Sequence, residues 1–88
     1  MAATVKLPKL GLTMEEATIN AWLVGVGQRV ERGQTLATIE SEKVEMELPA
    51  PVAGILAEQL VPVGETVAVG SPLAVIVADE AELGDYKR

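Results

Sequence analysis

An internal repeat constrains the fold of this 88-residue chain more than any other feature. When the sequence is aligned with itself at a shift of 37 residues, nine of the seventeen residues from 23 to 39 match those from 60 to 76. Both copies hold the block Val-Gly-x-x-Val-x-x-Gly, whose glycines suit turns with positive φ. Two copies are too few for a solenoid, which needs about three. We therefore expect two similar halves that close face to face by pseudo-twofold symmetry.

The residue types predict that each half is built from short strands. Valine, alanine and leucine dominate the apolar residues, and frequent glycine and proline divide the chain into short segments. No segment is long enough to predict an amphipathic helix. We expect strands near residues 4–7, 17–24, 29–30, 35–40, 44–48, 54–61, 66–67 and 73–77. The expected fold class is all-β, a sandwich or flattened barrel.

The repeat pattern ends before the last ten residues, six of which are charged. We expect residues 1–78 to form one domain and residues 79–88 to form a charged tail or the start of a linker. No uncharged stretch approaches the roughly 20 apolar residues of a membrane span, and the first nine residues lack the apolar run of a secretory signal. The expected location is cytoplasmic.

The composition excludes most self-contained chemistry. The chain has no histidine and no cysteine, so it offers no imidazole base, thiol nucleophile, disulfide, or zinc site of the usual type. Thirteen acidic residues against seven basic ones give a net charge of −6, which would repel nucleic acid. We expect no catalytic residue and no metal site, and therefore a domain that is not an enzyme on its own.

A hairpin between the two halves holds the candidate functional residue. In residues 44–48, apolar and acidic side chains alternate as in a half-buried strand, so the turn is expected within residues 40–44. Lys43 would then lie at the tip, and it is the only cation between Arg32 and Lys87. Its placement suits either a solvated lysine among glutamates or a lysine that an enzyme acylates.

The run from Glu40 to Gly54, ESEKVEMELPAPVAG, resembles the lipoyl-attachment motif of lipoyl domains in 2-oxo acid dehydrogenase acyltransferase components. The run from Leu7 to Met14, LPKLGLTM, and the repeat block are similar to that family too, so the resemblance covers roughly residues 4–78. It implies a flattened barrel of two four-stranded antiparallel sheets, with the lipoyl-lysine at a hairpin tip. By this resemblance, Lys43 carries lipoate in amide linkage.

The resemblance also implies a role and partners. The lipoyl arm would carry acyl groups from a thiamine-diphosphate-dependent dehydrogenase to an acyltransferase core and CoA, in a 2-oxo acid or acetoin dehydrogenase complex. A dihydrolipoyl dehydrogenase would reoxidise the arm, a lipoate ligase or lipoyl transferase would attach it, and the isolated domain would be monomeric. The residues expected to be recognised by partners are Glu40, Glu42, Val44, Gly11, Leu12, Thr13 and Met14.

Two alternatives share this kind of fold. Biotin carboxyl carrier domains also modify a hairpin lysine, but their signature has methionine on both sides, whereas Glu42 and Val44 flank Lys43 here. Structural segments of membrane-fusion adaptor proteins form the second alternative. These usually insert long helical hairpins between the two halves, and residues 43 to 54 leave no room for one.

Overall fold

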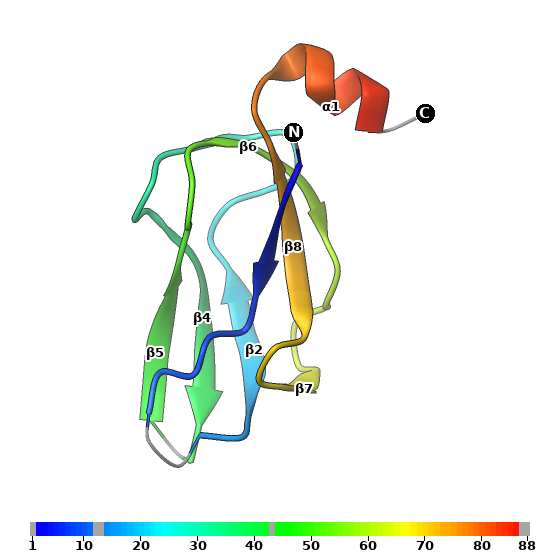
Figure 1. Cartoon of the computed structure of the whole chain (residues 1–88). Coiled ribbons are helices and arrows are strands. Elements are labelled where there is room, and N and C mark those ends of the chain that lie inside the picture. Colours follow the sequence, from blue (N-terminus) through cyan, green and yellow to red (C-terminus); the bar gives the residue numbers. More distant parts are fainter. Residues whose placement is uncertain (1, 12–13, 43, 87–88) are drawn as a thin grey trace.

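The computed structural model describes residues 2–11, 14–42 and 44–86. In these ranges, eight strands and one helix follow each other along the chain (Figure 1). They are β1 (Ala3–Lys6), β2 (Glu16–Trp22), β3 (Arg29–Val30), β4 (Thr35–Ser41), β5 (Val44–Pro49), β6 (Gly54–Gln59), β7 (Thr66–Ala68), β8 (Pro72–Val77) and α1 (Glu80–Tyr86). Each strand lies within about two residues of the range that the sequence predicts.

The strands form two four-stranded antiparallel sheets, with strand orders β1-β8-β6-β3 and β5-β4-β2-β7. The sheets face each other, and the β4–β5 hairpin tip lies at the end of the molecule opposite the N-terminus and α1 (Figure 1). This arrangement confirms the all-β flattened barrel-sandwich. Its largest extent is 39 Å, against 22 and 19 Å in the other two directions.

Backbone hydrogen bonds confirm that the two halves are equivalent. Gly27 N–H donates to the Leu56 carbonyl at 2.8 Å, and Gly64 N–H, 37 residues later, donates to the Ile19 carbonyl at 2.7 Å. The two glycines have φ angles of 93° and 91°, a conformation that side-chain-bearing residues rarely adopt. The repeated glycines therefore form the same turn in each half, and each turn is bonded to a strand of the other half.

Two side chains join the halves in the same reciprocal way. Trp22 Nε1 donates to the Val61 carbonyl at 2.9 Å, and Gln59 Nε2 donates to the Val24 carbonyl at 2.9 Å. Trp22 and Gln59 are 37 residues apart, as are Val24 and Val61. Buried carbonyls need hydrogen-bond partners, and here each half supplies the side-chain donor for a backbone carbonyl of the other half.

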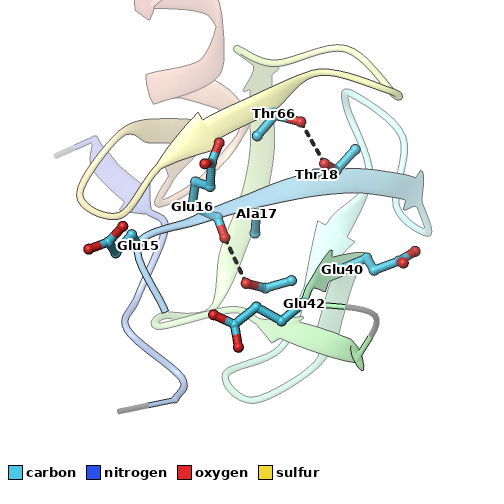
Figure 2. Close-up of a pocket in the computed structure, with 8 residues that line it drawn as sticks. Glu15, Glu16, Ala17, Thr18, Glu40, Glu42 and Thr66 are labelled. Atoms are coloured by element: carbon cyan, nitrogen blue, oxygen red, sulfur yellow. Dashed lines mark hydrogen bonds between the residues drawn. The ribbon is translucent and has the colours of Figure 1, made fainter. Parts of the chain in front are cut away.

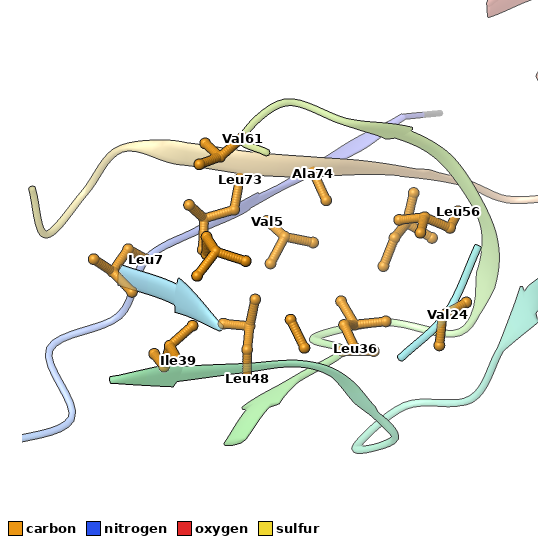
Figure 3. Packing of buried hydrophobic residues seen from close by; sticks show 14 of the residues in the cluster. Val5, Leu7, Val24, Leu36, Ile39, Leu48, Leu56, Val61, Leu73 and Ala74 are labelled. Atoms are coloured by element: carbon orange, nitrogen blue, oxygen red, sulfur yellow. The ribbon is translucent and has the colours of Figure 1, made fainter. Parts of the chain in front are cut away.

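The inner faces of the two sheets enclose one apolar core (Figure 3). Its largest fully buried side chains are Leu7, Ile19, Leu36, Ile39, Leu48, Leu56, Leu73 and Ile76. In the described part of the chain, no polar or charged side chain is buried. The core therefore depends on apolar burial and supplies no reactive group.

Helix α1 is the main difference from the sequence-based expectation, which gave residues 79–88 no helix. Asp79 Oδ1 accepts a hydrogen bond from Glu82 N–H at 2.9 Å, and Glu82 Oε1 accepts one from Ala78 N–H at 2.6 Å. These bonds cap the first turn of the helix. Leu83 then packs on a second apolar cluster, formed by Ile55, Ala57, Val75 and Val77 on the outer face of β6 and β8. No helix in the described residues has the length and apolar character needed to cross a membrane.

Candidate functional site

The β4–β5 hairpin closes with the shortest common connection. Ser41 pairs with Val44, so residues 42 and 43 alone separate the two paired strands. Such two-residue hairpin loops need a left-handed conformation, and Glu42 has a φ of 52°. The sequence placed the turn more broadly, within residues 40–44. The paired strands therefore continue up to Ser41 and Val44, on either side of the two-residue connection.

The apolar side of β5 runs from the core out toward the hairpin tip. Leu48 is 1% exposed, Met46 is half-buried, and Val44 is 58% exposed. These three side chains share one face because strand residues alternate. The sequence predicted this alternation, but Val44 lies beyond the part of the face that the core covers. The hairpin therefore presents an uncovered apolar residue next to residue 43.

Asn20 holds two glutamates of the hairpin together. Glu40 and Glu45 are opposite each other in the β4–β5 ladder. The Asn20 amide donates to Glu40 Oε1 and to Glu45 Oε2, both at 3.3 Å. Like charges opposite each other destabilise a sheet, and an amide that bonds both carboxylates offsets part of this repulsion. Asn20 was not predicted as a site residue, because no sequence pattern links it to Glu40 and Glu45, which are 20 and 25 residues away.

One side of the hairpin tip carries an acidic hollow of about 300 Å³ (Figure 2). Its walls are formed by Glu15, Glu16, Ala17, Thr18, Glu40, Ser41, Glu42 and Thr66. Ser41 Oγ donates to the Glu16 carbonyl at 2.8 Å, which attaches the tip to the start of β2. In the described residues, no three acidic side chains converge as a metal site would require.

A second hollow, of about 200 Å³, adjoins the same tip and is mainly apolar. It is lined by Leu10, Gly11, Met14, Ser41, Glu42, Val44 and Met46. Ser41 and Glu42 line both hollows, so the hairpin end separates them. We call them the acidic hollow and the apolar hollow.

The structure brings most of the described recognition candidates to this one end. Glu40, Glu42 and Val44 are exposed on the hairpin, and Gly11 is exposed beside it. Met14, in contrast, is only 5% exposed, because it packs into the core from the loop between β1 and β2. Lys43, Leu12 and Thr13 lie outside the described residues.

Comparison with known proteins decides the family. Residues 3–76 match the biotin/lipoyl family model, described as "Biotin-requiring enzyme". The chain belongs to the biotin/lipoyl family. The residues matched include the whole sandwich except the last residue of β8.

Two sequence relatives of this family member are acyltransferase components. The chain is 45% identical to the dihydrolipoyllysine-residue acetyltransferase component of the pyruvate dehydrogenase complex of Zymomonas mobilis, over 97% of this chain and 19% of that protein. It is 42% identical to the corresponding component of the acetoin cleaving system of Bacillus subtilis, over 86% of this chain and 19% of that protein. The chain thus spans about a fifth of the length of these relatives.

Two solved structures are similar to the chain over most of its length, and one of them is a lipoyl domain. The lipoyl domain of the 2-oxoglutarate dehydrogenase complex of Azotobacter vinelandii has a TM-score of 0.69 and 29% identity, over 86% of this chain and 96% of that one. The urea carboxylase of Kluyveromyces lactis has a TM-score of 0.75 and 27% identity, over 88% of this chain and 6% of that one. The named sequence relatives favour the lipoyl branch over the biotinyl branch.

Proposed function

We propose that this domain is a lipoyl carrier, with lipoate joined to Lys43 in amide linkage. The observation that supports it most strongly is the two-residue connection between Ser41 and Val44, which contains residue 43. The similarity to dihydrolipoyllysine-residue acyltransferase components supports the choice of lipoate. The flanking residues Glu42 and Val44 support it too, because the biotinyl signature has methionine at both places.

The residues around the tip fit such a group. Glu40, Glu42 and Val44 are exposed, so a modifying enzyme can approach both flanks of residue 43. Strand pairing continues up to Ser41 and Val44, and a paired hairpin is the kind of support that favours precise presentation of an attached group to a partner. When bound, lipoate would supply the thiol–disulfide and acyl-carrying chemistry, which the side chains of this domain lack.

The partners follow from the same proposal. A thiamine-diphosphate-dependent dehydrogenase would load the arm, an acyltransferase core would unload it to CoA, and a dihydrolipoyl dehydrogenase would reoxidise it. A lipoate ligase or lipoyl transferase would attach lipoate, and the isolated domain would be a monomer. The finer expectations, which include the monomeric state and a cytoplasmic location, stay predictions of the sequence.

Acyl loading tests the proposal. The lipoylated domain is mixed with thiamine diphosphate and each of three dehydrogenase components, taken from a pyruvate, a 2-oxoglutarate and an acetoin system, and each component receives its own substrate: pyruvate, 2-oxoglutarate or acetoin. We expect one of them to add a single acyl mass to the domain, and the Lys43→Arg variant to gain none. A lipoylated domain that gains no acyl group from any of the three would contradict the carrier role in these complexes.

The second candidate function is a biotin carboxyl carrier, favoured by the structural similarity to a urea carboxylase. A streptavidin blot of the domain, produced in cells that supply both biotin and lipoate, separates the two. We expect no retention of biotin. A strong streptavidin signal that disappears in Lys43→Arg would favour the biotinyl function instead.

A further inference from the structure

The apolar hollow beside the hairpin tip is an incompletely filled apolar surface. Leu10 is 42% exposed and Val44 is 58% exposed, while the side chains of Met14 and Met46 extend into the core cluster below them. Apolar surface left in contact with water favours a ligand that covers it. The hollow therefore suits a small apolar group.

The position of this hollow in the chain indicates which group could reach it. Glu42 and Val44 both line the hollow, and they are the two neighbours of residue 43 in the sequence. A group attached at residue 43 would be tethered at the rim. Tethering gives a high effective concentration, so even a weak apolar contact would be occupied for a substantial fraction of the time.

The two hollows differ in how well their side chains suit a lipoyl group. A lipoyl group on lysine is neutral, because the amide removes the amine charge, and it consists of an aliphatic chain that ends in a ring with two sulfur atoms. The acidic hollow presents the carboxylates of Glu15, Glu16 and Glu40, which make no favourable contact with a neutral, apolar group. The apolar hollow presents aliphatic side chains and the thioethers of Met14 and Met46, which are soft and polarisable.

We propose that the apolar hollow formed by Leu10, Met14, Val44 and Met46 is a resting site for the dithiolane end of the arm on Lys43. The inference rests on the proposed lipoyl function and adds a site to it. The docked arm would exchange with a free one, because the hollow is open to solvent. A partner that covers the hairpin tip would compete with the hollow and release the arm.

Methionine methyl groups report on this site directly. The chain has three methionines, and two of them, Met14 and Met46, line the hollow. Protein labelled with ¹³C at the methionine methyls is compared in three forms, which carry an unmodified, an acetylated and a lipoylated Lys43. The acetylated form loses the lysine charge as the lipoylated form does, but it has no dithiolane.

We expect the Met14 and Met46 methyl signals to shift in the lipoylated form alone, with cross-relaxation between the Met46 methyl and the dithiolane protons. Equal shifts in the acetylated and lipoylated forms, with no cross-relaxation, would overturn the inference and leave the lipoyl function intact. A chain that lipoate does not modify, as measured by intact mass, would overturn the proposed function together with this inference.

A matched pair of variants tests the same site by reactivity. Val44 and Val63 are both 58% exposed, but only Val44 lines the hollow. In lipoylated protein, we expect Val44→Ser to speed the reduction of the dithiolane by a bulky phosphine by about two- to ten-fold, because polar substitution weakens apolar burial. Val63→Ser should leave the rate unchanged. Equal rates for both variants and the unaltered protein would count against docking.

Discussion

Asn20 and Ala57 occupy equivalent positions in the two halves, 37 residues apart, and each is the extra residue of a β-bulge. The bulge in β2 lies between Ile19 and Ala21, and the bulge in β6 lies between Leu56 and Glu58. Bulges redirect side chains, and the two bulged residues make different contacts in the two sheets. Asn20 bonds the hairpin glutamates, whereas Ala57 belongs to the apolar cluster on which Leu83 of α1 packs. The repeat has therefore diverged at one position into a site-supporting residue and a helix-supporting one.

This relationship predicts that a carboxylate at position 20 destabilises the hairpin. Asn20→Asp replaces the bridging amide by a third negative charge beside Glu40 and Glu45. We expect the free energy of unfolding to fall by about 0.5–1.5 kcal/mol at low salt, and part of the loss to be recovered in 0.5 M salt because salt screens the repulsion. Urea unfolding, followed by Trp22 fluorescence, measures it. Asn20→Ala should show a smaller loss with little salt dependence, and an equal salt dependence in both variants would contradict the explanation.

The close packing around Gly54, at the start of β6, predicts that any side chain at this position destabilises the fold. A Cβ placed there would lie 2.2 Å from the Val77 carbonyl oxygen and 2.8 Å from Ile76 Cγ2. Since the nearest atom belongs to the backbone of β8, it cannot rotate away. We expect Gly54→Ala to lower the free energy of unfolding by about 3 kcal/mol or more.

Gly84 offers the matched control for that substitution. It lies inside α1, and a Cβ there would meet nothing within 4 Å. Gly84→Ala should leave the stability unchanged or raise it by up to about 1 kcal/mol, because alanine favours helix. Thermal unfolding of both variants under the same conditions provides the measurement. Similar losses in the two would show that the close approach at Gly54 is not the cause.

The contact between Tyr86 and Glu58 predicts that the packing of α1 on β6 depends on pH. Its hydroxyl donates a hydrogen bond to Glu58 Oε1, and this bond, together with desolvation and the Glu58 charge, raises the pKa of Tyr86 above its usual value of 10. A raised pKa means that the contact stabilises the folded state below pH 10 and that this contribution is lost as the phenol ionises at higher pH. Tyr86 is the only tyrosine, so absorbance at 295 nm follows it alone among phenols.

The variant that tests this contact is Glu58→Gln, which removes the negative charge and the carboxylate acceptor. We expect the pKa of Tyr86 to return toward 10. Glu65→Gln, a change at an exposed glutamate in the turn before β7, should leave the Tyr86 titration unchanged. If Glu58→Gln also leaves it unchanged, the Glu58 carboxylate is not what raises the pKa.

The sequence predicted the sandwich well because the fold is recorded in local patterns. Glycine spacing set the turns at Gly27 and Gly64, and the shift of 37 residues gave the pairing symmetry. The acidic and apolar alternation after residue 43 gave β5 its inward face. Each of these signals can be read along the chain without knowledge of tertiary contacts, which is why the strand positions could be predicted from the sequence alone.

Sequence patterns predict the structure less well where contacts between distant residues decide it. Helix α1 has a local capping pattern in Asp79 and Glu82, but its packing through Leu83 on the outer face of β6 and β8 is a contact between distant residues that no local pattern reveals. Met14 was expected among the recognition residues, and its burial follows from packing against the core. The two hollows at the tip combine residues of the first loop, β2 and the hairpin, so only the folded chain brings their walls together.

Site-resolved mass spectrometry of the modified domain tests the central claim most directly. The chain has four lysines, Lys6, Lys9, Lys43 and Lys87, and the domain is produced in cells that can attach both lipoate and biotin. We predict one lipoyl increment per chain, located on Lys43 by peptide fragmentation, and no modified chain in the Lys43→Arg variant. A lipoyl group on another lysine, a biotinyl group on Lys43, or a fully unmodified wild-type chain would contradict the account.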